Sequence, residues 1–128
     1  MILCDTNILI ELFKDNETVK HELRQIGLAE LSISVITSAE LYFGARDKTE
    51  LVKIQKRLTA LRQVELDPEI SAIFVELMGK YVLSHHLSLP DALIAATTLR
   101  HDAVLYTYNL KDFKYIPGIK IYQENNAR

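Results

Sequence analysis

ILCDTNILIELF, residues 2–13, contains the pattern that decides the fold. Ile2 to Cys4 form an apolar run without alternation, which is typical of a parallel strand covered by helices on both faces. The run ends at Asp5, and apolar residues then recur at helical spacing as far as Phe13. The chain is therefore predicted to begin with a buried strand that ends in a carboxylate and leads directly into a helix.

Strand patterns alternate with helix patterns along the rest of the chain. Such an order requires crossover connections, so the predicted fold class is α/β, with a mainly parallel sheet between layers of helices. The polar residues 123–128 are expected to fray. Strands are expected over residues 2–5, 31–36, 64–66, 104–107 and 119–122, and helices are expected to begin near residues 6, 16, 37, 49, 68 and 91.

Composition limits the class of protein. With 128 residues, 48% of them apolar, the chain can bury one sizeable core but not two, so residues 1–128 are expected to form a single domain. No stretch approaches the roughly 20 consecutive apolar residues that span a membrane, and the N-terminus lacks the basic region of a signal peptide, so a cytoplasmic protein is expected. A net charge of -2 gives no general attraction to polyanions, so a nucleic acid would have to bind at a local basic patch.

Four acidic residues fall where the carboxyl ends of the predicted strands meet. Asp5 ends the first strand, Glu40 follows the second, and Asp112 lies a few residues beyond a later strand. Asp91 opens the helix that precedes that later strand. In open parallel sheets the reactive groups gather beyond these strand ends, so the four carboxylates are expected at one rim of the sheet. Short polar side chains accompany them: Thr6, Asn7, Thr107 and Asn109.

Each acid taken alone also has a structural explanation. Asp5 is suited to cap the helix that follows it, and Glu40 completes a capping box with Thr37. Asp91 is an ordinary acid for a first helical turn, and Asp112 is an ordinary turn residue. None of these explanations accounts for the coincidence of all four acids with short polar neighbours, so a shared site is the favoured interpretation.

Carboxylates that converge in a partly buried cleft repel one another unless a cation neutralises them. With oxygen ligands and no cluster of histidines or thiols, such a site suits a hard ion, Mg²⁺ or Mn²⁺, which keeps several waters and shares its other positions with substrate phosphate. An ion of this kind lowers the pKa of a bound water and polarises a phosphoryl oxygen. The chemistry that follows is hydrolysis of phosphodiester bonds.

The segments that carry these acids resemble a known family. They read, in chain order, DTN at residues 5–7, ITSAEL at 36–41 with Gly44 behind it, PDALIAA at 90–96, and TYNLKDF at 107–113 with Pro117 and Gly118 behind it. Together they resemble the PIN domain and, within that family, the VapC ribonuclease toxins of type II toxin–antitoxin pairs. The resemblance covers essentially the whole chain, and its strength lies in the order of all four motifs because each motif alone is weak.

The resemblance implies a PIN-like, Rossmann-like α/β/α sandwich and a Mg²⁺- or Mn²⁺-dependent endoribonuclease. It also implies a homodimer that a cognate VapB-like antitoxin inhibits by inserting its C-terminal segment into the cleft. Asp112 matches the last acidic position, which varies in the family, so coordination through water stays open there. The implied catalytic metal ligands are Asp5, Glu40, Asp91 and Asp112, with supporting hydrogen bonds from Thr6, Asn7, Thr107 and Asn109.

Basic side chains offer contacts to RNA. Lys14, near the first helix, and Arg46, beyond the helix of Glu40, are the positions expected to meet substrate phosphates. A further basic run has two interpretations, either the solvated face of an amphipathic helix or a surface for RNA or an acidic partner. Its members are Lys48, Lys53, Lys56, Arg57 and Arg62.

Three other kinds of function stay open. A receiver-like signalling module would share the α/β layers and an aspartate at a strand end, but it normally needs two acids after the first strand, and here Thr6 and Asn7 follow Asp5. A haloacid-dehalogenase-type phosphatase would need an aspartate at the position of Asn7. A catalytically silent PIN-like scaffold that binds RNA or protein is the third alternative, and the four intact acids count against it.

Overall fold

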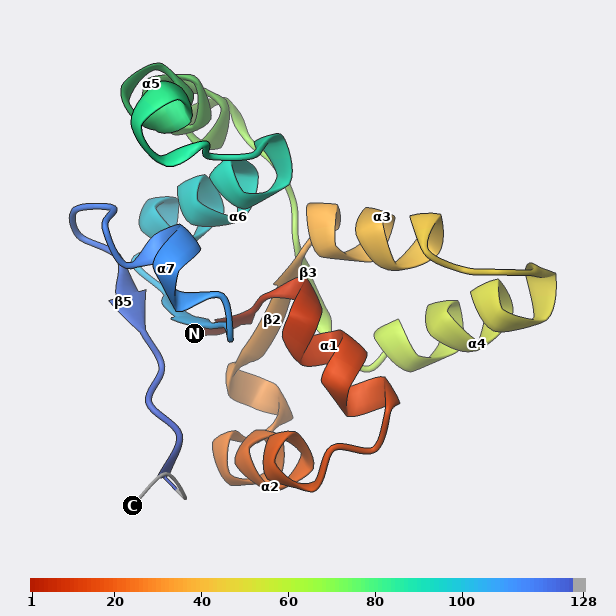
Figure 1. Cartoon of the computed structure of the whole chain (residues 1–128). Coiled ribbons are helices and arrows are strands. Elements are labelled where there is room, and N and C mark those ends of the chain that lie inside the picture. The colour runs from red at the N-terminus through yellow and green to blue at the C-terminus, as the bar shows by residue number, and fades with distance from the viewer. Residues whose placement is uncertain (126–128) are drawn as a thin grey trace.

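Five short strands form one parallel sheet. Figure 1 shows the strands with helices around them. The computed structural model describes residues 1–125. The strands are β1 (Ile2–Cys4), β2 (Leu31–Ser34), β3 (Arg62–Val64), β4 (Val104–Tyr106) and β5 (Lys120–Ile121). β1 is the middle strand, with β2 and then β3 on one side and β4 and then β5 on the other. Every neighbouring pair is parallel, as the sequence pattern predicted.

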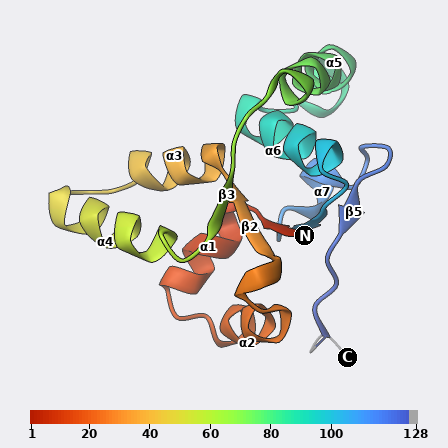
Figure 2. The ribbon, with the colours of Figure 1, turned by 180° about the vertical axis from the view of Figure 1, so that it is seen from behind.

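Helices cover both faces of the sheet. They are α1 (Thr6–Phe13), α2 (Glu17–Ile26), α3 (Val35–Phe43), α4 (Lys48–Leu58), α5 (Pro68–His85), α6 (Leu89–Arg100) and α7 (Leu110–Phe113), with a 3₁₀ turn η1 (Leu28–Glu30). In Figures 1 and 2, α5 and α6 lie side by side, and the α3–α4 pair extends away from the sheet. Among residues 1–125, no helix has both the length and the apolar character needed to cross a membrane.

The two faces of the sheet carry separate cores because successive residues of a strand point to opposite faces. Leu3 and Leu105 are buried on the face that packs against α5, α6 and α7. Cys4 and Tyr106 are buried on the other face, against α1, α2 and α4. The predicted α/β/α sandwich is confirmed, and its two cores fix the strand ends on which the acids lie.

Serine side chains start the two helices that carry Glu40 and Asp91. The Ser34 hydroxyl accepts a hydrogen bond from the backbone N–H of Ile36 (3.1 Å), so α3 begins two residues before Thr37, where the sequence had placed its start. The Ser88 hydroxyl accepts from the N–H of Asp91 (3.3 Å), and α6 also begins two residues early. In each case a cap directly ahead of the helix replaces the expected later start.

Strand pairing shifts two other predicted boundaries. β3 lies earlier than the expected 64–66 because its residues pair with 32–34 of β2. The last strand is shorter than the expected 119–122. The expectation of a frayed end is wrong for residues 123–125, where Glu124 and Asn125 form hydrogen bonds, while residues 126–128 lie outside the described chain.

Candidate functional site

The strand order creates a switch point at the carboxyl end of β1. From β1 the chain adds β2 and β3 on one side, and it then returns to add β4 and β5 on the other. A crevice forms beyond the strand ends at such a point, and ligands of open α/β sheets bind there. Asp5, the first residue after β1, lies at this point.

Asp5 is buried, with 3% of its surface exposed, and three donors hold its carboxylate. Oδ1 accepts from the backbone N–H of Thr6 (2.8 Å). Oδ2 accepts from the Thr107 hydroxyl (2.8 Å) and from the Asn7 side-chain amide (3.3 Å). The bond from Thr6 caps α1, so the capping role expected of Asp5 is confirmed, and Oδ2 is tied to the residue after β4 as well.

Glu40 reaches from α3 toward the start of α1. Its Oε1 accepts a hydrogen bond from the Thr6 hydroxyl (2.7 Å), and the Thr37 hydroxyl lies 3.1 Å from the same Thr6 oxygen. The capping box expected between Thr37 and Glu40 is wrong, because Ser34 caps α3 and both side chains face α1. Thr6 therefore joins the helices that carry Asp5 and Glu40.

Asp91 and Asp112 enter the same rim from α6 and α7. Asp91 lies in the first turn of α6, and Asp112 lies in the short helix that follows β4. Burial raises the pKa of Asp91 to about 6, and the negative charges of the other three acids add to that rise, while a hydrogen bond from Ser88 opposes it. Ionisation of Asp91 therefore opposes folding, because its carboxylate is partly buried and lies near other negative charges.

Burial and neighbouring negative charges also raise the pKa of Asp5. Burial is the main cause that raises the pKa of Asp5, and the charges of Glu40 and Asp112 raise it further. The hydrogen bonds from Thr107 and from the N–H of Thr6 act in the opposite direction, because they favour the charged carboxylate. The four acids thus share one electrostatic environment, which we call the acidic rim (Asp5, Glu40, Asp91 and Asp112).

The acidic rim is not a preformed metal site. Within residues 1–125, no three Asp, Glu, His or Cys side chains lie close enough together to hold an ion as they stand. The charges of Glu40 and Asp112 nevertheless act on both Asp5 and Asp91, as expected of carboxylates that border a common space. Because the acidic rim offers only carboxylate oxygen atoms as ligands, its residues fit a hard cation such as Mg²⁺.

The short polar companions of the acids also gather at the rim. Asn7 Oδ1 accepts from the backbone N–H of Tyr108 (3.3 Å), in addition to the bond that Asn7 donates to Asp5. The Thr107 hydroxyl accepts from the N–H of Asn109 (3.0 Å) while it donates to Asp5. The structure therefore brings Thr6, Asn7 and Thr107 together through their side chains and Asn109 through its backbone. Sequence analysis did not single out Tyr108, whose backbone joins this network.

A model of the PIN domain matches residues 2–119 of this chain. The chain belongs to the PIN-domain family. The match spans all four segments on which the resemblance rests, so the family identified from the sequence is confirmed. Membership of this family excludes the receiver-like alternative.

Solved structures similar to this PIN domain come from toxin–antitoxin complexes. A chain of the toxin–antitoxin complex from Klebsiella pneumoniae is 34% identical, with a TM-score of 0.78 over 93% of this chain and 95% of that chain. A chain of FitAcB from Neisseria gonorrhoeae is 25% identical, with a TM-score of 0.79 over 97% and 98% of the two chains. VapBC2 from Rickettsia felis, bound to a DNA fragment from its promoter, is 24% identical, with a TM-score of 0.83 over 95% and 98%, and shows the fold alone. No curated protein sequence matches this chain.

A groove of about 750 Å³ borders the acidic rim of this PIN domain and is lined by α1, α3, α4 and the residues between α3 and α4. Glu40 lines this larger groove together with Lys14 and Arg46, the two basic residues expected to meet substrate. Arg46 donates to Glu50 through Nε (3.0 Å) and Nη2 (2.9 Å), and Lys14 pairs with Glu11 at 3.9 Å. Both basic side chains are exposed, so a bound anion could replace these partners.

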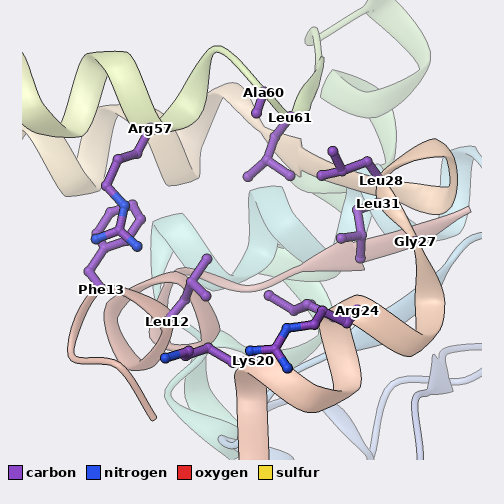
Figure 3. A pocket seen from close by; sticks show the side chains of 11 residues that line it. Leu12, Phe13, Lys20, Arg24, Gly27, Leu28, Leu31, Arg57, Ala60 and Leu61 are labelled. Carbon is purple, nitrogen blue, oxygen red and sulfur yellow. The ribbon is translucent and has the colours of Figure 1, made fainter. Parts of the chain in front are cut away.

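A smaller groove, of about 440 Å³, adjoins the larger one because Phe13 and Arg57 line both. Figure 3 shows its leucine side chains between α1, α2 and α4, with Lys20 and Arg24 among the lining residues. Arg57 lies over the Phe13 ring, 4.2 Å from the ring centroid. The sequence indicates only the basic face of α4, because the apolar walls of both grooves come from helices that are distant in the chain.

Proposed function

We propose that this PIN domain, over residues 1–128, is the toxin of a VapBC-type pair and acts in the cytoplasm as a metal-dependent endoribonuclease. The observation that carries the proposal is the acidic rim at the switch point of the sheet, where burial and the charges of neighbouring carboxylates raise the pKa of Asp5 and of Asp91. Such a cluster opposes folding, and a divalent cation would relieve the repulsion. The 34% identity to a chain of a toxin–antitoxin complex supports the toxin assignment.

The four acids would hold Mg²⁺ or Mn²⁺, which when bound supplies a Lewis acid that activates water and polarises the phosphate. Asp5 is the fixed member of the set, since three hydrogen bonds orient its carboxylate. Thr6 orients Glu40, and Asp91, with a pKa of about 6, is mostly ionised at neutral pH. The proposed ligands are Asp5, Glu40, Asp91 and Asp112, the last of them directly or through water.

The RNA backbone is proposed to lie in the larger groove. Lys14 and Arg46 would bind phosphates that flank the scissile bond, because both line the groove that Glu40 also lines. These local contacts matter since a chain with a net charge of -2 has no general attraction for RNA. Arg46 would exchange its bonds to Glu50 for a phosphate, which its planar guanidinium can bind through two N–H groups.

The proposed inhibitor is a cognate VapB-like antitoxin whose C-terminal segment lies in the two grooves. Their apolar walls favour apolar side chains of that segment, and their basic residues favour acidic ones. Because the larger groove borders Glu40, a segment bound there would cover the acidic rim. Arg57 lines both grooves, and its replacement by glutamate is therefore expected to weaken the complex.

A homodimer is proposed as well. Phe43 at the end of α3 is 94% exposed and Leu83 near the end of α5 is 90% exposed, and apolar surface of this kind is suited to a second copy of the chain. Sedimentation velocity of the wild type and of Leu83→Glu tests this assembly. A wild type that sediments as a monomer at all concentrations would contradict it.

Incubation of the purified chain with labelled single-stranded RNA tests the enzyme assignment. Cleavage is expected with Mg²⁺ or Mn²⁺ and is expected to stop when EDTA is added. Asp5→Asn, which keeps the shape of the side chain, is the matched control for a contaminating nuclease. If the folded wild type cuts no RNA with either ion and its expression leaves host growth unchanged, the assignment is wrong, and tight RNA binding in the same experiment would favour the silent scaffold.

A further inference from the structure

The residues after β5 bind back onto β4 instead of leaving the fold. In this C-terminal segment (residues 122–125), the N–H of Tyr122 donates to a β4 carbonyl (2.8 Å) and so continues the pairing of β5 with β4. The Glu124 carboxylate accepts from the Tyr106 hydroxyl (2.5 Å) and, through the same Oε2 atom, from the Tyr108 hydroxyl. Glu124 is therefore tied both to β4 and to the loop beyond it.

A second carboxylate holds the C-terminal segment from α2. Glu22 is fully buried, and its Oε1 accepts from the Tyr122 hydroxyl (3.0 Å) and from the N–H of Asn125 (2.7 Å). The rings of Tyr106 and Tyr122 also pack together, with centroids 4.7 Å apart. The segment is thus anchored in the core by Glu22 independently of the bonds that Glu124 accepts.

The loop that Glu124 binds is the loop that orients Asp5. The backbone N–H of Tyr108 donates to Asn7 Oδ1 (3.3 Å), and Asn7 in turn donates to Asp5. The residue before Tyr108, Thr107, donates its hydroxyl to Asp5 at 2.8 Å. Displacement of Tyr108 would therefore move two of the three donors that hold the Asp5 carboxylate.

We propose that Glu124 is a positioning residue for the acidic rim, because it holds the loop of residues 107–109 in the form that orients Asp5. This inference rests on the proposed function, in which the orientation of Asp5 sets the rate of RNA cleavage. If the segment served only to cover the core, its contact with the buried Tyr106 would be sufficient. Tyr108 is 42% exposed, so its bond to Glu124 covers little apolar surface and serves instead to fix the loop.

Two hydroxyl deletions form a matched pair for the test. Tyr108→Phe removes the bond between the loop and Glu124, whereas Tyr122→Phe removes a bond between the C-terminal segment and Glu22. With Mg²⁺ and single-stranded RNA, Tyr108→Phe is expected to lower kcat about tenfold with little change in KM, because misplacement of a reacting group reduces turnover more than binding. Tyr122→Phe is expected to lower the thermal midpoint and to keep kcat within about twofold of the wild type.

Substitutions of Glu124 itself separate positioning from folding. Glu124→Ala is expected to lose kcat as Tyr108→Phe does, and Glu124→Gln is expected to recover most of it because the amide oxygen still accepts from both hydroxyls. An equal loss of kcat in Tyr108→Phe and Tyr122→Phe would overturn the proposal. Wild-type kcat in folded Glu124→Ala would overturn it as well.

A readout without RNA keeps the two proposals distinguishable. In the NMR spectrum of the ¹⁵N-labelled chain, Glu124→Ala and Tyr108→Phe are expected to shift the side-chain amide signals of Asn7, and Tyr122→Phe is expected to leave them in place. Unchanged Asn7 signals in Glu124→Ala would refute the positioning role whether or not the protein cuts RNA. A wild type that cuts no RNA but shows the expected shifts would refute only the proposed enzyme.

Discussion

Asp91 in the acidic rim differs from the two carboxylates that hold the C-terminal segment, Glu22 and Glu124, in the kind of neighbour it has. Asp91 faces the charges of three other acids, and together with burial these raise its pKa to about 6. Glu124 faces two tyrosine hydroxyls, and Glu22 faces a tyrosine hydroxyl and a backbone N–H. Carboxylates that the fold supplies with donors stabilise the fold, whereas carboxylates that it sets against one another are suited to a cation.

Neutralisation of the acidic rim is expected to have the largest effect. Asp5→Asn and Asp91→Asn should each reduce RNA cleavage by roughly a hundredfold or more, because each removes a charge at the proposed metal site without a change of shape. Asp112→Asn should lose only about tenfold if Asp112 acts through water. Initial rates with labelled RNA measure the ranking, and circular dichroism checks the fold. Full activity of Asp91→Asn would show that the charge of Asp91 in the acidic rim has no role in RNA cleavage.

Removal of the α2 carboxylate that holds the C-terminal segment should instead affect stability. Glu22→Ala is expected to lower the free energy of unfolding by about 2 kcal/mol, because two donors lose their buried acceptor. Glu30→Ala serves as the control, since Glu30 is exposed and pairs with the N-terminal ammonium. Urea unfolding measures both variants. Equal stability of the two variants would show that the buried hydrogen bonds of Glu22 contribute nothing.

The pH dependence of stability should report the strain at the acidic rim. Because the folded-state pKa of Asp91 is raised from 3.8 to about 6, the folded chain binds a proton more tightly than the unfolded chain, and its stability should fall as pH rises from about 4 to about 6. Asp91→Asn should flatten this fall and stabilise the protein in EDTA at pH 7 by roughly 1 kcal/mol or less, since water screens a partly exposed carboxyl.

Thermal midpoints measured against pH in EDTA test this prediction. Mg²⁺ is expected to raise the midpoint of the wild type at pH 7 and to have a smaller effect on Asp91→Asn, because the variant offers the ion one carboxylate fewer. Parallel pH curves for the wild type and the variant would show that Asp91 bears no such strain.

The smallest effect is expected at the edge of the larger groove. Arg46→Ala should leave stability close to that of the wild type, because its pair with Glu50 is exposed to water. The same substitution should raise the KM for RNA a few fold, roughly the loss of one phosphate contact, and the effect should shrink as salt is added. A KM that is unchanged at low salt would place the RNA elsewhere on the surface.

Local patterns predicted the strands, most helices and the rim on which the acids lie, because strand direction and helical periodicity depend on neighbours in the chain. The same reasoning misplaced the start of α3, since Thr37 and Glu40 have the spacing of a capping box while Ser34 is the actual cap. Both residues turn instead to Thr6, more than thirty positions away in the chain. No local sequence pattern predicts such a contact.

From its sequence alone this chain is committed to carboxylates at the ends of parallel strands, and hence to oxygen ligands at one rim of an α/β sheet. Only the tertiary structure decided that Thr107 would meet Asp5 across 102 positions, that Glu124 would bind the loop of residues 107–109, and that two grooves would open beside α4. The physical reason is the distance in sequence between the residues that interact. A residue type and its spacing specify an element, but the partner of a buried carboxylate is set by how distant elements pack, and packing depends on the whole chain.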